Sequence, residues 1–221
     1  MTQKPASLKN KAPARAWQRM LSGRRLDLLD PSPVDIEIED IALGLSRVAR
    51  WNGQTTGAWG YTVADHSLLV ERLFRGFRPG ASAQDCLIVL LHDAPEYVVG
   101  DLITPFKSAV GGDYKSLEER LIQAVHLRFG LPATISKSLK ADTKRADRMA
   151  AFLEATQLAG FSEAEARKIL GAPPRGMIFE ELEALPPQKA GEAFLARFAE
   201  LNAAVQAGLQ QKQSPKRKRG S

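Results

Sequence analysis

Cysteine is almost absent from this 221-residue chain, which contains Cys86 alone. A single cysteine excludes the internal disulfide framework that stabilises many small secreted domains. No apolar stretch approaches the roughly 20 residues that a membrane-spanning helix needs, and the basic first 25 residues lack the apolar core of a signal peptide. We therefore expect a cytoplasmic protein without a membrane partner, in which Cys86, part of an apolar run, is a small buried thiol.

Acidic residues are absent from both ends of the chain. Residues 1–25 contain seven lysines and arginines, and residues 212–221 contain five more. The net charge of the whole chain is +6, so residues 26–211 carry a net charge of −6. Because the basic excess lies in the two ends, we do not expect the folded part to bind nucleic acid.

The length and the 44% hydrophobic content fit one globular domain with a substantial core. We predict a mobile basic N-terminal segment over residues 1–22, a folded domain over 23–209 and a disordered basic tail over 210–221. Internal repeats are absent.

Apolar residues recur with helical spacing through most of the predicted domain, which indicates an all-α, bundle-like fold. Only residues 24–38, with two prolines, predict extended structure or turns, and the alternation over 35–38 is typical of a short strand. Glycine, proline and capping residues bound the predicted helices: 40–50, 63–75, 83–93, 95–99, 114–129, one after Pro132 that carries Asp147, 162–170 and 188–209.

Potential metal ligands are concentrated between Leu91 and Lys107, in the sequence LHDAPEYVVGDLITPFK. An adjacent pair, His92-Asp93, is followed by Glu96 and Asp101. An apolar run precedes this segment and a Thr-Pro turn follows it. The pattern predicts a helix that brings polar side chains to the mouth of a pocket.

A divalent metal ion needs several nitrogen or oxygen donors that converge. Histidine is scarce, so the candidates are few: His66 and His92 adjoin apolar helical runs, whereas His126 belongs to no motif and is left out. With Asp93 and Asp147, the two histidines form a ligand set from different predicted helices, which suits the core of a bundle. The set accepts Mn, Co, Fe, Zn or Mg without choosing among them.

These motifs resemble those of the HD-domain metal-dependent phosphohydrolases, and most closely the bacterial 5′-deoxynucleotidases. The resemblance covers about residues 50 to 153. Its motifs are Arg50-Trp51, His66-Ser67, His92-Asp93-x-x-Glu96, Gly100-Asp101, Thr104-Pro105-x-Lys107 and Ala146-Asp147. It implies a single HD-domain helical bundle, a divalent transition metal ion and a homodimer. It also favours Asp147 over the rival fourth ligand Asp142.

The remaining polar residues have expected roles in a phosphate-ester site. Glu96 is expected to be a general acid or base, and the resemblance implies catalysis or substrate orientation for Asp101. A guanidinium can hold a phosphate with two hydrogen bonds, which suits Arg50, with Arg47 as its alternative. Trp51 offers a flat wall for a sugar or base, and Lys107 adds charge to the phosphate pocket.

We therefore expect a metal-dependent phosphohydrolase, a phosphomonoesterase like the 5′-nucleotidases. Its partner would be a small phosphate ester, a (deoxy)nucleoside 5′-monophosphate. Two alternatives remain open at this point. One is hydrolysis of nucleoside triphosphates or guanosine tetraphosphate, and the other is a non-catalytic HD-type module that binds nucleotides.

Overall fold

The computed structural model describes residues 16–102, 112–171, 173 and 181–213. Across these residues the fold is all-α, as predicted, apart from a small hairpin. None of the helices described is long and apolar enough to cross a lipid bilayer. The elements are the strands β1 (Trp17–Arg19) and β2 (Arg25–Asp27), and the helices α1 (Ile38–Leu45), α2 (Val63–Phe77), α3 (Ala83–Leu90), α4 (Glu96–Val99), α6 (Gly112–Arg128), α7 (Lys137–Gln157), α8 (Glu163–Leu170) and α9 (Pro187–Gln213), with 3-10 turns at Pro33–Asp35 and Arg50–Gly53.

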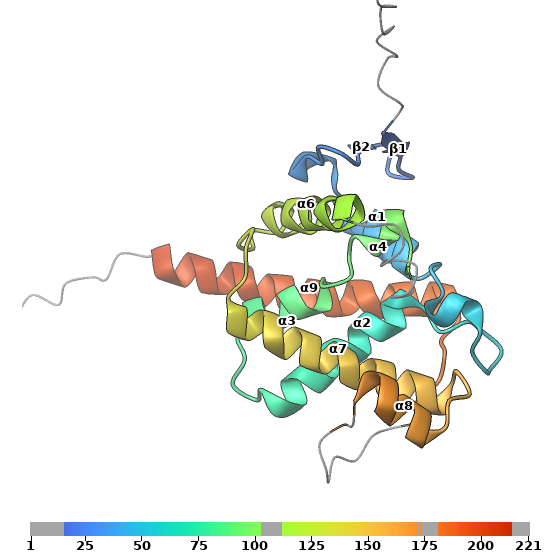
Figure 1. Ribbon diagram of the computed structural model, residues 1–221. Helices are drawn as coiled ribbons and strands as arrows, with labels where there is room; N and C mark the ends of the chain where they lie inside the picture. The colour runs from blue at the N-terminus through green and yellow to red at the C-terminus, as the bar shows by residue number, and fades with distance from the viewer. Residues whose placement is uncertain (1–15, 103–111, 172, 174–180, 214–221) are drawn as a thin grey trace, which may run out of the picture.

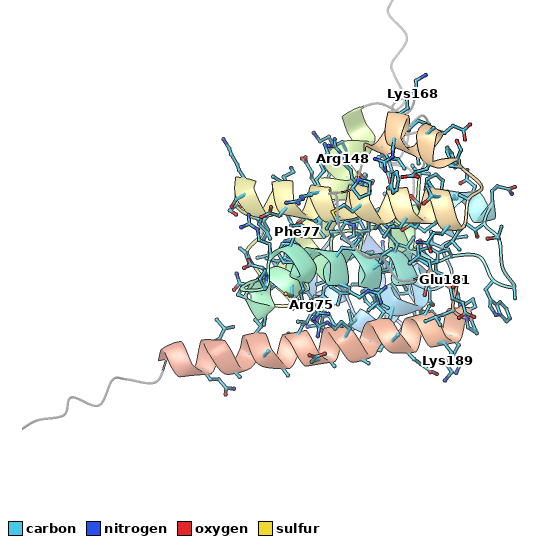
Figure 2. The ribbon with its side chains drawn as sticks, turned by 90° about the horizontal axis from the view of Figure 1, so that it is seen from below. Arg75, Phe77, Arg148, Lys168, Glu181 and Lys189 are labelled. Carbon is cyan, nitrogen blue, oxygen red and sulfur yellow. The ribbon has the colours of Figure 1, made fainter. Side chains whose placement is uncertain are left out.

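Helix α2 lies at the centre of the bundle, where it packs against α3, α7 and α9. In the view of Figure 1, α6, α1 and α4 lie above α9, and α7 and α8 lie below it. Figure 2, seen from below, shows α2 between α7 and α9, with its side chains filling the space on both sides. Phe74 of α2 and Phe194 of α9 are almost completely buried in this core. Burial of such side chains stabilises each helix more than helix propensity does.

Three helices begin where the sequence places a capping residue. In each, a hydroxyl accepts the N–H three residues ahead, and the side chain of that residue accepts a hydrogen bond in return. The pairs are Thr62 with Asp65 in α2, Ser82 with Asp85 in α3, and Ser162 with Glu165 in α8. These caps fix the start of α2, and therefore the position of His66 in its first turns.

Helix α3 ends at Leu90, so the prediction of a helix through residue 93 is wrong. Leu91 to Pro95 form a turn in which His92 N–H donates to Val89 O and Ala94 N–H to Leu91 O, three residues back in each case. Pro95 has no N–H and disfavours helical geometry in the residue before it. The chain therefore resumes as the short helix α4, which ends at Gly100 with a φ of 76°.

Helix α1 also ends early, at Leu45 instead of residue 50. Beyond it, the backbone leaves the helix to bond with the residues before α2: Val63 N–H donates to Val48 O at 3.0 Å, and Arg50 N–H to Tyr61 O at 2.7 Å. These bonds place Arg50 and Trp51 beside the start of α2. The helix begins at Ile38 and not at Asp40, whose carboxylate instead accepts Ser22 N–H at 3.0 Å.

The strand predicted over residues 35–38 is not formed. Ile36 is extended and fully buried, but its carbonyl accepts the Arg128 side chain at 2.7 Å and pairs with no strand in the described part of the chain. The alternation reflected burial of one isoleucine and not sheet pairing.

Both predicted domain boundaries need correction. β1 pairs antiparallel with β2, with Trp17 opposite Asp27, and Met20 is buried in the core. Residues 16–22 are therefore part of the folded domain. At the other end α9 continues to Gln213. The helix therefore extends past residue 210, where the tail was predicted to begin.

Candidate metal centre

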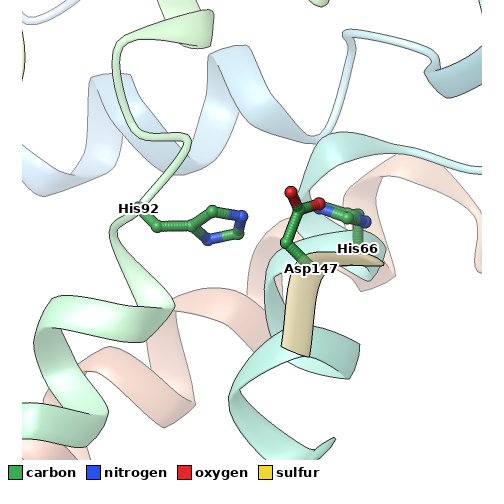
Figure 3. A group of neighbouring side chains, drawn as sticks. All are labelled: His66, His92 and Asp147. Atoms are coloured by element: carbon green, nitrogen blue, oxygen red, sulfur yellow. The ribbon is translucent and has the colours of Figure 1, made fainter. Parts of the chain in front are cut away.

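Three elements bring His66, His92 and Asp147 together. His66 lies in the first turns of α2, His92 in the turn after α3, and Asp147 in the middle of α7. One donor atom from each lies within 4.8 Å of the other two, a group that could hold a metal ion. Figure 3 shows the Asp147 carboxylate between the two imidazole rings.

Both histidines point Nε2 into this group, because Nδ1 is held elsewhere. His66 Nδ1 lies 2.5 Å from Glu154 Oε1, and His92 Nδ1 lies 2.9 Å from Val89 O. Each Nε2 is buried and has no hydrogen-bond partner in the described part of the protein. Metal-binding histidines are typically oriented this way, with one nitrogen fixed by an acceptor and the other directed at the metal.

Asp93, the fourth predicted ligand, lies beside this group. Its Oδ2 lies 3.4 Å from His66 Nε2 and 3.3 Å from His92 Nε2, and Asp147 Oδ1 lies 3.4 Å from His66 Nε2. These separations are too long for good hydrogen bonds but suit donors around a common ion. The side chains of Asp93 and Asp147 are 24% and 39% exposed, so the group is open to solvent on their side, whereas His66 is fully buried.

The electrostatics favour a positive charge at the centre of the group. Burial raises the pKa of Asp93, but His92 and His66 outweigh this effect and hold it well below its ordinary value. Burial and Arg50 lower the pKa of His66, yet Glu154, Asp147 and Asp93 hold it well above its usual range. A divalent ion supplies this positive charge as well as a proton does, so the donor set fits a metal.

Glu154 is the central residue that the sequence did not reveal. It lies seven residues after Asp147 on the same face of α7, and it is fully buried. Burial raises its pKa, but His66, Arg50 and the Trp51 N–H lower it to about 2. The carboxylate is therefore ionised. A lone acid within the apolar run from Ala150 to Ala155 was the available signal.

The Arg50-Trp51 pair lies beside the histidines, and the Glu154 carboxylate connects this pair to His66. Glu154 Oε1 holds His66, while Oε2 accepts Arg50 Nε at 3.3 Å and Trp51 Nε1 at 3.0 Å. Arg50 Nη1 also donates to Asp101 Oδ2 at 3.0 Å. The structure thus brings together four residues that were predicted for different roles: His66, Arg50, Trp51 and Asp101. Arg50, and not its alternative Arg47, makes these ion pairs.

Trp51 and Asn52 adopt left-handed backbone conformations, with φ of 56° and 51°. Such conformations cost roughly 1 kcal/mol or more for residues other than glycine and persist only where surrounding contacts enforce them. Here the Trp51 indole donates to Glu154 and packs on Phe161 with ring centres 5.5 Å apart. Trp51 is therefore held rigidly at the edge of the centre.

Glu96 is buried at the first position of α4, and its N–H donates to Asp93 O at 3.0 Å. It adjoins the centre through the turn and not along one continuous helix. Asp142, the rival ligand, points elsewhere and pairs with Arg78 at 2.6 Å. His126 is buried, and its Nδ1 lies near Pro132 O, away from the group. Lys107, with the Thr104-Pro105 turn, lies outside the described residues.

Two proteins match the chain in sequence. It is 59% identical over 187 residues to the uncharacterized protein RCAP_rcc00048 of Rhodobacter capsulatus, covering 83% of this chain and 94% of that protein. It is 32% identical over 106 residues to the uncharacterized protein YfdR of Escherichia coli, covering 48% of this chain and 54% of YfdR. No model of a known protein family matches the chain.

Proposed function

The chain belongs to the same protein family as the Rhodobacter capsulatus protein RCAP_rcc00048, and we propose that it is a metal-dependent phosphohydrolase. The substrate is a nucleotide, with 5′-monophosphates as the first compounds to test. The proposal includes membership of the HD-domain superfamily, which rests on the sequence motifs described above.

One observation carries the proposal. Two buried imidazoles, each fixed through Nδ1, direct unpartnered Nε2 atoms toward the carboxylates of Asp93 and Asp147. Histidines that served only the core would be expected to bond both nitrogens, because an unsatisfied buried polar atom costs roughly 1–3 kcal/mol. Four donors that converge beside an arginine are suited to holding a metal ion and a phosphate together.

His66, His92, Asp93 and Asp147 would hold the ion in this mechanism. A divalent ion there would acidify a bound water and offset charge on the phosphoryl oxygens. Arg50 already directs two nitrogens at Asp101 and Glu154, so its Nη2 is the nitrogen left to contact a phosphoryl oxygen. In this proposal Glu96 would move a proton, and Asp101, which accepts a hydrogen bond from Arg50, would orient it.

Phosphate release from a panel of 5′-deoxy- and ribonucleotides, with EDTA and with added Mn or Co, tests this function. We expect metal-dependent release that falls by at least 100-fold in Asp93→Ala and Asp147→Ala. Asp142→Ala is the matched control, since it removes the same side chain from the same helix without touching the centre. Release that survives EDTA, or that is equal in Asp142→Ala and Asp147→Ala, would refute the proposal.

A further inference from the structure

A cavity of about 500 Å³ opens beside the metal centre, between α6 and α7. His92 and Asp147 line one end of it. The rest is lined by residues of α6 and α7, by Ile88 of α3 and by residues 133–135, none of which was part of the predicted site. The volume is large enough for a nucleoside, since binding sites for small ligands begin at roughly 300 Å³.

On α7, the cavity face continues directly from the metal ligand. Lys140 and Lys144 lie seven and three residues before Asp147, on the same side of the helix. The helical rise places them roughly 10 and 5 Å along the axis from that residue. Neither lysine forms an ion pair within the described ranges of the chain, although the body of the protein is acidic. Both lysines are exposed, and their positive charges near the metal ligands would attract an anion.

On α6, His126 contributes the buried polar atom of the cavity wall. Its Nδ1 lies 3.1 Å from Pro132 O, and its Nε2 is buried without a partner in the described structure. Burial lowers the pKa of His126, so the ring is neutral at pH 7 and Nε2 is an acceptor. It would accept a hydrogen bond from an N–H or O–H group of a ligand. Ile88, Ile122 and Ile135 provide apolar walls around it.

We propose that this cavity binds the nucleoside part of the substrate together with a second phosphate group, which faces Lys140 and Lys144. A base or sugar would lie against the isoleucines and donate a hydrogen bond to His126. The inference rests on the proposed function and adds that nucleotides with more than one phosphate bind more tightly than monophosphates. Glu119, which also lines the cavity, lies 3.9 Å from Lys115, and among the described residues it forms an ion pair with neither Lys140 nor Lys144.

Calorimetric titration of the Mn-loaded protein with two probes tests the inference. The probes are adenosine mono- and triphosphate analogues in which CH₂ groups replace the bridging oxygens, so that binding is measured without hydrolysis. We expect the triphosphate analogue to bind about tenfold more tightly, because its additional phosphates would face the two lysines. In Lys140→Gln/Lys144→Gln this difference should fall to about twofold or less.

The matched control is Lys137→Gln/Lys168→Gln, which removes two charges outside the cavity; Figure 2 shows Lys168 projecting from α8. It should keep the tenfold difference. Equal binding of both probes to the wild type, no binding of either, or equal losses in both double variants would overturn the inference. If the probes bind as expected but no nucleotide is hydrolysed, the proposed function fails while the binding site stands. If nucleotides are hydrolysed but both probes bind equally, the proposed function stands and the proposed binding site fails.

Discussion

At the scale of single residues, Glu154 shows how one buried side chain can hold several others in position. Its two oxygens have different tasks: Oε1 orients His66, and Oε2 holds Arg50 and Trp51. Motif spacing revealed the residues that face the centre, because their types are those of ligands and phosphate binders. It could not reveal Glu154, whose importance depends on the three-dimensional proximity of α7, α2 and the 3-10 turn at residue 50.

Replacing Glu154 by glutamine should weaken metal binding by about 10- to 100-fold, as is typical for the loss of an acceptor that orients a ligand. Glutamine can accept from either His66 or the Arg50-Trp51 pair, but it cannot serve both with oxygens. Isothermal titration with Mn or Co measures the affinity, and Glu163→Gln on the exposed face of α8 is the control. Unchanged affinity would show that His66 does not depend on Glu154.

Cys86 should be nearly inert in the native protein. Burial and the Glu71 carboxylate raise its thiol pKa to about 11, and the side chain is buried in α3. Because only the thiolate reacts, alkylation by iodoacetamide should be slow at pH 8 and should accelerate as the pH rises toward 11. Mass spectrometry follows the reaction, and the urea-unfolded chain provides the reference. Equally fast labelling of native and unfolded protein at pH 8 would contradict this.

At the scale of elements, the sequence predicted most helices but not the turn from Leu91 to Pro95, which contains His92 and Asp93. Caps and apolar spacing are local signals, so α2, α6 and α8 were predicted to within about two residues. The ends of α1 and α3 are decided by other interactions. After α1, the Val48 and Tyr61 carbonyls accept hydrogen bonds from the N–H groups of Val63 and Arg50. After α3, Pro95 interrupts the helical hydrogen bonds. The second of these causes was visible in the sequence, and the first was not.

The contact between α1 and α4 should depend on Gly44. A Cβ there would lie 2.6 Å from Tyr97 Cβ and 2.9 Å from Tyr97 O, so Gly44→Ala would push away the helix that begins with Glu96. We expect a loss of about 1–3 kcal/mol in the free energy of unfolding, measured by urea denaturation.

Gly76 of α2 provides the control, because a Cβ there meets nothing within 4 Å. Gly76→Ala should be neutral or slightly stabilising, since alanine favours the helix more than glycine does. Equal stability of the two variants would mean that α4 can shift without cost.

At the scale of the whole molecule, the helical spacing of apolar residues predicted the all-α fold, and the charge distribution predicted an acidic body with basic ends. It could not place the second face of the site. The cavity between α6 and α7 exists only because two amphipathic faces, separate in sequence, lie opposite one another. Since His126, Lys140 and Lys144 belong to no motif, nothing in the sequence connected them to His92.

Removing residues 214–221 should leave the metal centre intact and reduce retention on heparin. The cut follows the last residue of α9 and removes four of the basic side chains, from Lys216 to Arg219. We expect unchanged thermal unfolding and metal affinity, with elution at lower salt because fewer counterions are released on binding. If the truncated chain lost metal affinity, the C-terminal residues would have a role in the domain itself.

The shared carboxylate of Glu154 has a thermodynamic consequence. Glu154 bonds His66 through one oxygen, and Arg50 and Trp51 through the other. If a metal ion at His66 strengthens the bonds to Arg50 and Trp51, metal binding changes the affinity for nucleotide, and nucleotide binding changes the affinity for metal. Linkage then requires the effect to be reciprocal: the factor by which metal strengthens nucleotide binding equals the factor by which nucleotide strengthens metal binding. Titrations in both orders should give the same factor in the wild type, and a factor near one in Glu154→Gln. In such a protein, a change in the concentration of either metal or substrate would change the occupancy of both sites.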